Sequence, residues 1–153
     1  MSNLTNVITL DGYQYAVKMN GYSRSWVRQF NSSITAGIIR VTFIDRGPGI
    51  QIYKIMLELR TWSTASLPYR LGVTQTWDQQ LANLETSYNK TRNSLQFVDP
   101  LGNVPYIPGT STNSGVYFLD YLQTIPPYAT PDKPSIQATI ELQNAAFIVG
   151  PTS

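Results

Sequence analysis

Apolar and polar residues alternate over much of this 153-residue chain. Such alternation predicts β-strands, because successive side chains of a strand point to opposite faces of a sheet. β-Branched and aromatic residues, which favour strands, are common in the same segments. The strands predicted by this pattern lie at 7–10, 13–19, 24–30, 38–45, 50–60, 95–98, 104–107, 116–123 and 136–142.

The segment 50–60 shows the layering that we expect of the sheet. Lys54 and Glu58 share one face, which we predict to be at least partly exposed to water. The opposite face carries the apolar side chains that we predict to form part of the core, which are Tyr53, Ile55, Leu57 and Leu59.

Four segments between the strands have the composition of turns or connectors. Asp11-Gly12 is a signal for a two-residue hairpin loop, and DRGPG at 45–49 predicts a tight hairpin loop between its flanking strands. DPLG at 99–102 has Asp, Pro and Gly where a type I turn prefers them, so we interpret Asp99 as a turn residue rather than a catalytic acid. IPPYATPDKP at 125–134 contains four prolines and predicts an extended connector.

One segment has a helical period instead. We predict a helix near 76–90, where Thr76 and Gln79 form a capping box and Asp78 lies where the helix dipole favours an anion. The apolar stripe of this helix is predicted to consist of Trp77, Leu81, Leu84 and Tyr88, at spacings of four, three and four.

One helix among about ten short strands predicts a mainly β fold. We expect an antiparallel β-sandwich or barrel flanked by the helix. The length of 153 residues is typical of one hydrophobic core, so we expect residues 1–153 to form a single domain.

Charged residues make up only 13% of the chain, against about 25% in an average globular protein. A surface so poor in charge is typical of proteins that bury much of themselves against neighbours, although a neutral polar exterior has the same composition. The net charge is +2. Residues 1–70 carry eight Lys or Arg against three acids, and residues 71–153 carry three against six. This asymmetry favours head-to-tail association of subunits, unless the two halves interleave in the fold.

The chain contains no Cys and no His. That composition excludes disulfides, thiolate nucleophiles, zinc fingers and His-based catalytic triads. No nucleophile elbow, phosphate-binding loop or calcium loop is present, and Glu58, Glu85 and Glu141 are scattered. We therefore expect no enzyme activity, no metal and no cofactor. We also expect no signal peptide and no membrane insertion.

The segment GYSRSWVRQF at 21–30 is the strongest candidate for a functional surface. Tyr22, Arg24, Trp26, Arg28 and Phe30 have the same parity, so on a strand they project from one face. One interpretation is a subunit interface, where Tyr, Trp and Arg are enriched. A second is a core strand whose arginine stems lie along apolar surface. A third is stacking on single-stranded nucleic acid, which the low net charge disfavours.

The order of these features resembles that of the phage tail-tube and distal-tail protein group. An extended β region with a long hairpin comes first and is followed by the helix, which has the form W-x-x-x-L-x-x-L. Then come a strand ending in FVDPLG, the segment GVYFLDYLQTIPP and a final strand SIQATIELQ. The resemblance covers mainly residues 71–142.

In that group, a β-sandwich flanked by one helix assembles into hexameric rings around the tail channel. The resemblance therefore implies a structural virion protein without catalytic residues, made in the host cytoplasm. It implies a homo-oligomeric ring that contacts other tail or baseplate proteins, with DNA only as passing cargo. It also implies that the hairpin around 45–49 extends the inner sheet of the ring. A tube subunit, a single-domain distal-tail ring and a connector at either tail end all fit the sequence.

Two other functions are open on the residues alone. The first is a β-rich binding module, which recognises glycans through aromatic residues such as Trp62 or single-stranded nucleic acid through the 22–30 face. The second is a virion decoration or receptor-binding protein, because such proteins are also rich in β-structure.

Overall fold

The computed structural model describes residues 6–27, 30–34, 41–45, 50–90, 94–106 and 114–144. The fold is mainly β, as the sequence predicts. The elements in chain order are β1 (Val7–Leu10), β2 (Tyr13–Val27), β3 (Phe30–Ile34), β4 (Val41–Asp45), β5 (Ile50–Arg60), α1 (Leu67–Arg70), α2 (Trp77–Asn89), β6 (Phe97–Val98), β7 (Val116–Thr124) and β8 (Ser135–Asn144).

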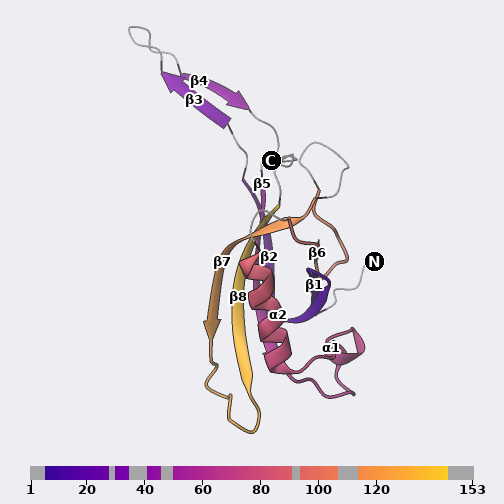
Figure 1. Ribbon diagram of the computed structural model, residues 1–153. Coiled ribbons are helices and arrows are strands. Elements are labelled where there is room, and N and C mark those ends of the chain that lie inside the picture. The colour runs from indigo at the N-terminus through magenta and orange to yellow at the C-terminus, as the bar shows by residue number, and fades with distance from the viewer. Residues whose placement is uncertain are drawn as a thin grey trace.

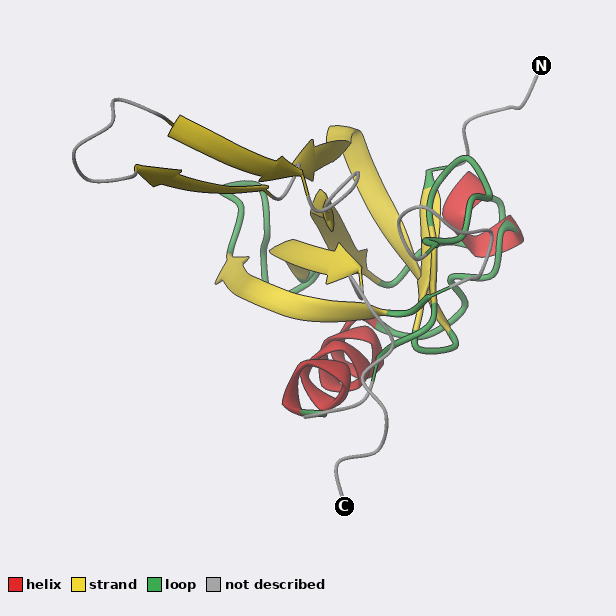
Figure 2. Ribbon diagram, turned by 90° about the horizontal axis from the view of Figure 1, so that it is seen from above, coloured by secondary structure: helices red, strands yellow, loops and turns green. Residues whose placement is uncertain are grey.

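Six of the strands form one antiparallel sheet in the order β6-β1-β2-β5-β8-β7. The sheet curls into a half-barrel, which Figure 2 shows from above. Among the described residues its two edges meet at one bridge, where the backbone N–H of Leu95 and that of Val116 each donate to the other's carbonyl at 2.9 Å. This bridge draws the edge strands β6 and β7 together at one point.

The first hairpin has the predicted two-residue loop. Leu10 pairs with Tyr13, so Asp11 and Gly12 alone connect β1 to β2. Both loop residues have positive φ, 53° at Asp11 and 85° at Gly12. That combination is characteristic of a type I′ turn, whose twist matches the twist of the flanking strands.

The predicted strands 13–19 and 24–30 overlap one long strand, β2, which a bulge interrupts. Val17 is paired with Leu57 and Tyr22 with Ile55, so β2 has three more residues than β5 between these two pairs. An odd number of extra residues reverses which side chains point inward. The inward side of β2 is therefore odd-numbered up to Val17 and even-numbered from Tyr22 onward.

The core lies on the inner face of the half-barrel. The two faces of β5 are divided as predicted: the odd-numbered side chains are buried and Lys54 is exposed. Leu84 of α2 packs into the same core. The largest fully buried apolar side chains are Tyr15, Tyr53, Phe97, Ile8, Leu10, Ile55, Leu57, Leu59, Leu84, Ile140 and Leu142.

Helix α2 lies across the open side of the half-barrel (Figure 1). At one side, Asp11 Oδ2 accepts hydrogen bonds from Ser87 Oγ at 2.9 Å and from Lys90 Nζ at 2.5 Å. At the other side, Glu85 Oε1 accepts a hydrogen bond of 3.0 Å from Gln123 Nε2 of β7. The helix thus connects the β1–β2 hairpin to the far edge of the sheet.

The helix has the predicted position, but its buried face differs from the predicted stripe. The buried residues are Gln80, Leu84 and Ser87, whereas Tyr88 is 48% exposed. The Nε2 of Gln80 donates to two backbone carbonyls, at 2.7 and 2.8 Å, while its Oε1 is buried without a partner among the described residues. A buried donor with such partners carries little penalty, which an apolar pattern does not capture.

The strands β3 and β4 pair with each other in a separate two-stranded sheet. Figure 1 shows this hairpin, the arm, projecting beyond one end of the half-barrel. The prediction of a hairpin loop at 45–49 is wrong, because β4 pairs with β3 and β5 pairs with β2 and β8. Residues 46–49 themselves lie outside the described residues. Glycine and proline indicate that a strand is interrupted, but not whether the chain reverses there or which strands pair.

Two further predictions concern the segments 104–107 and 125–134. The strand predicted at 104–107 is absent at Val104 and Pro105, since proline cannot donate to a strand ladder, and residue 107 lies outside the described residues. The segment 125–134 carries neither helix nor strand and connects β7 to β8, as predicted, but it is not extended, because hydrogen bonds close turns at 126–129 and 130–133. Among the described residues, no helix has the length and apolar character needed to cross a membrane.

Candidate functional site

The predicted surface at 22–30 faces the core at its beginning and solvent further along. Tyr22 and Arg24 are partly buried, and Trp26 is 53% exposed. All three lie on the inner face of the sheet, since their partners on β5 are Ile55, Tyr53 and Gln51. Arg28 lies outside the described residues, and the backbone of Phe30 begins β3.

Tyr22 is held by contacts within the chain. Its hydroxyl donates a hydrogen bond of 3.0 Å to Asp99, and its ring lies 6.5 Å from that of Tyr53. Burial raises the pKa of Tyr22, and the neighbouring carboxylate of Asp99 raises it further. Tyr22 therefore acts as a packing residue rather than as an open stacking platform.

Arg24 and Trp26 form a pair on the same strand. The guanidinium carbon of Arg24 lies 4.6 Å from the centre of the Trp26 ring, a cation–π distance. Trp26 is more than half exposed, so among the side chains that the structure describes this pair is the accessible part of the predicted surface. It lies where β2 leaves the half-barrel toward the arm.

The interpretation of Asp99 as a turn residue agrees with its contacts. The N–H of Gly102 donates to the Asp99 carbonyl at 2.9 Å, which closes the four-residue turn, and Gly102 has a φ of 83°. The Asp99 side chain is 3% exposed and accepts hydrogen bonds from the backbone N–H groups of Leu101 and Asn103. These bonds use the carboxylate to hold the chain.

Strand β7 presents the main surface that the sequence did not single out. It is the last strand of the sheet, and among the described residues only the Leu95 bridge pairs with its outer edge. Leu119, Leu122 and Ile125 are 48%, 57% and 77% exposed. Leu119 lies in a bulge, and Leu122 points to the outer face opposite Thr139. The unbroken apolar run VYFL at 116–119 is the signal in the sequence, because it puts apolar side chains on both faces of the strand.

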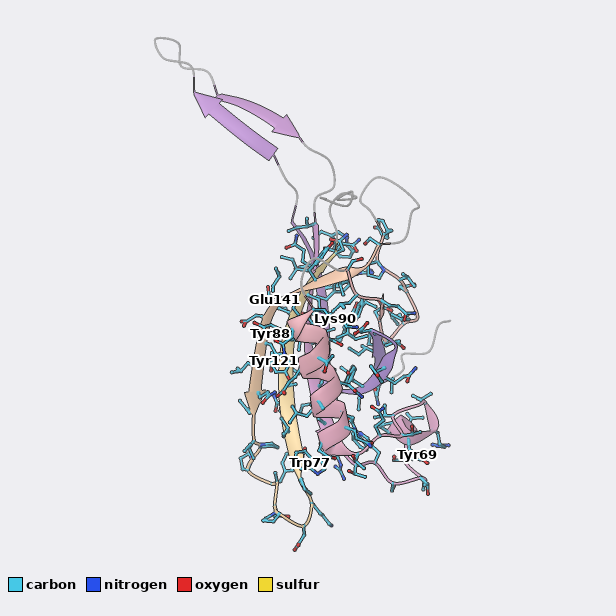
Figure 3. The ribbon with its side chains drawn as sticks, viewed as in Figure 1. Tyr69, Trp77, Tyr88, Lys90, Tyr121 and Glu141 are labelled. Carbon is cyan, nitrogen blue, oxygen red and sulfur yellow. The ribbon has the colours of Figure 1, made fainter. Side chains whose placement is uncertain are left out.

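Aromatic side chains join this edge to the helix. Figure 3 shows Tyr88 of α2 beside Tyr121 of β7, with ring centres 5.4 Å apart. The Tyr88 ring also lies 5.4 Å from that of Phe118, almost perpendicular to it. Together with Leu122 and Glu85, the two tyrosines line an open groove of about 430 Å³ between helix and edge strand.

A pocket of about 410 Å³ lies at the end of β5, beside the β7–β8 connector. Trp62 and Tyr128 line it, and both come from segments without helix or strand. The Tyr128 hydroxyl donates a hydrogen bond of 3.1 Å to Glu58, whose Oε1 lies 3.7 Å from Arg60 Nη1. The Arg60 guanidinium in turn lies 4.7 Å from the centre of the Trp62 ring.

The carboxylates that the sequence left scattered have separate partners. Glu58 belongs to the pocket network, Glu85 bonds Gln123, and Glu141 lies opposite Lys54 in the sheet register. Among the described residues, no three carboxylates come close enough together to hold a metal ion.

No protein-family model matches the chain, and no curated protein matches it.

Proposed function

We propose that this chain is a structural protein of a phage tail that self-assembles into a ring, as a tail-tube, distal-tail or connector subunit. The tail assignment rests on the resemblance in the order of sequence features described above. The observation that supports self-assembly is the open edge of β7, with Leu119, Leu122 and Ile125 exposed beside it.

An open strand edge favours association because its outward backbone N–H and C=O groups can pair with another strand. Exposed apolar side chains beside such an edge favour burial against a partner. Strand β7 carries one charged residue, Asp120, and Glu85 of α2 lines the groove beside it. A ring therefore gains both hydrogen bonds and apolar contact when this edge is covered.

A ring needs two different surfaces on each subunit, since its contacts are head-to-tail. The arm is the candidate for the second surface. Among the described residues it is a two-stranded sheet that pairs with no other strand, and such hairpins are marginally stable alone in water. In the sequence, residues 28–46 carry Arg28, Arg40 and Arg46 against one acid, Asp45, a net charge opposite in sign to that of Asp120 on β7.

The test is to measure the mass of the purified chain by sedimentation velocity and to image it by electron microscopy. We expect closed rings of one size. Leu122→Asp should yield monomers, because it places a charge on the contact surface, while Leu101→Asp changes a comparably exposed leucine on the 99–102 turn and should leave the rings intact. A parent chain that stays monomeric at high concentration, and does not assemble on a partner ring, would contradict self-assembly.

The tail assignment has an independent test. Neighbouring genes should encode a tape-measure protein, a tail tube or baseplate parts. Rings without such neighbours would support a self-assembling protein of another kind and would argue against a tail.

A further inference from the structure

We propose that the pocket at the end of β5 binds a neutral saccharide of one or two sugar rings. This site goes beyond the proposed assembly function, and its lining does not include Leu119, Leu122 or Ile125 of the β7 edge. Figure 1 shows the β7–β8 connector, which borders the pocket, at the end of the molecule opposite the arm.

Two aromatic side chains in the pocket lining favour a sugar ligand. Trp62 and Tyr128 both line the pocket, and aromatic rings stack on the apolar C–H faces of sugars. The two rings are held in place by one network: Tyr128 donates to Glu58, Glu58 lies beside Arg60, and Arg60 covers Trp62. Rings positioned before binding lose little side-chain entropy when the ligand arrives.

Part of the lining is polar, because Thr61, Ser63 and Ser66 carry hydroxyl groups. Thr61 Oγ1 already accepts from the N–H of Trp77 and can still donate, and Ser66 Oγ already donates to the Ser63 carbonyl and can still accept. A sugar presents the same mixture of donors and acceptors.

The charged residues in and beside the lining favour a neutral ligand. Arg60 and Lys133 line the pocket, but Asp132 lies beside Lys133 in the lining and Glu58 lies beside Arg60. The positive charges are therefore matched by negative ones, which disfavours phosphates and other polyanions. The volume of about 410 Å³ is at the lower end of the range of about 300–1,000 Å³ for small-molecule sites, which suits one or two sugar rings.

The experiment is a titration of the full chain with glucose, maltose, cellobiose, N-acetylglucosamine and N,N′-diacetylchitobiose, followed by tryptophan fluorescence and calorimetry. We expect saturable binding of at least one of them with a Kd between about 10 µM and 10 mM. Tyr128→Ala should weaken that binding by about tenfold or more, whereas Tyr128→Phe keeps the ring and should change it by less than about threefold. Trp62→Ala should abolish it.

Controls separate loss of binding from loss of fold. Tyr128 is 55% exposed, so its replacement should leave the melting temperature nearly unchanged, and Trp26→Ala alters an exposed tryptophan elsewhere and should leave saccharide binding intact. Absence of saturable binding by all five saccharides would overturn the proposal. So would binding of inorganic phosphate or a mononucleotide in place of any saccharide, or equal weakening by Tyr128→Phe and Tyr128→Ala. None of these results depends on ring formation, which electron microscopy reports separately.

Discussion

The hydroxyl of Tyr22 donates a hydrogen bond of 3.0 Å to Oδ2 of Asp99, which ties the long strand β2 to the turn after β6. The other carboxylate oxygen accepts from the N–H of Leu101 at 2.9 Å and of Asn103 at 2.7 Å. One buried carboxylate thus satisfies three donors from two parts of the chain.

We expect Asp99→Asn to fold and assemble like the parent. The amide oxygen can still accept both backbone N–H groups, and the amide nitrogen can donate to the Tyr22 hydroxyl. Asp99→Ala leaves three donors without an acceptor and should lower the free energy of unfolding by about 1–3 kcal/mol. Urea unfolding of the two variants measures the difference. Equal losses of the free energy of unfolding in the two variants would mean that the negative charge of Asp99 is required for stability. If Asp99→Asn folded normally but lost a measurable activity, Asp99 would have a chemical role.

Stability should fall in alkaline solution because the core contains tyrosines that resist ionisation. Burial raises the pKa of Tyr53 from 10.0 to about 12, and burial also raises the pKa of Tyr22. Above pH 10 the unfolded chain releases these protons while the folded chain keeps them. Each such tyrosine therefore contributes stability that is fully present below pH 10 and is lost as the pH rises through the folded-state pKa.

The expected slope is a loss of about 1.4 kcal/mol per pH unit for each of these tyrosines between pH 10 and the folded-state pKa. Urea unfolding at pH 8, 10, 11 and 12 measures it. Tyr53→Phe should make the decline shallower by one tyrosine's share, which separates this effect from the titration of lysines. A decline as steep in Tyr53→Phe as in the parent would show that Tyr53 does not contribute.

Two buried phenols differ in their hydroxyl partners, and we expect their replacement to have opposite effects. Tyr15 Oη is buried without a partner among the described residues, whereas Tyr53 donates a hydrogen bond of 2.6 Å to Gln51 Oε1. Tyr15→Phe should therefore raise the free energy of unfolding at pH 7 by about 1 kcal/mol, and Tyr53→Phe should lower it by a similar amount. Thermal unfolding distinguishes the two. Destabilisation by Tyr15→Phe would indicate that its hydroxyl has a partner, such as a bound water.

The sequence predicted those elements whose pattern is local. The alternation at 50–60 matches β5, and Thr76 with the following turns of helix matches α2. The predictions from the sequence were wrong where contacts between distant parts of the chain determine which residues are buried or which strands pair. Gln80 Nε2 and Ser87 Oγ have partners distant along the chain, at Arg60 and Asp11, and β5 pairs with β2 and β8 rather than with the adjacent β4. These contacts cannot be recognised from the residues that are adjacent in the sequence.

The candidate surfaces, too, were predicted only as far as a local pattern determines them. Equal parity placed Tyr22, Arg24 and Trp26 on one face, and the register confirms that placement. The bulge in β2 between Val17 and Tyr22 determines whether that face points inward, and the alternation of apolar and polar residues did not predict the bulge. The pocket joins Trp62 to Tyr128, which are far apart in sequence, so only the pairing of β5 with β8 brings them together.

Gly21 is the position at which the bulge in β2 is most sensitive to substitution. A Cβ atom there would lie 2.8 Å from the Lys18 carbonyl oxygen and 2.9 Å from the Met56 carbonyl oxygen, and both are backbone atoms that cannot rotate away. Gly21→Ala must therefore shift the strand, and we expect a loss of about 1–3 kcal/mol in the free energy of unfolding.

The shift should also disturb the residue that follows the bulge. Tyr22 turns inward only because the bulge reverses the parity of β2, so a displaced strand weakens its bond to Asp99. We therefore expect Gly21→Ala and Tyr22→Phe together to cost less than the sum of the two single losses, as coupled neighbours do. Ser23→Ala, at an exposed position two residues on, is the matched control and should change stability by less than about 0.5 kcal/mol. A stable Gly21→Ala variant, or strict additivity with Tyr22→Phe, would mean that the bulge does not set the position of Tyr22.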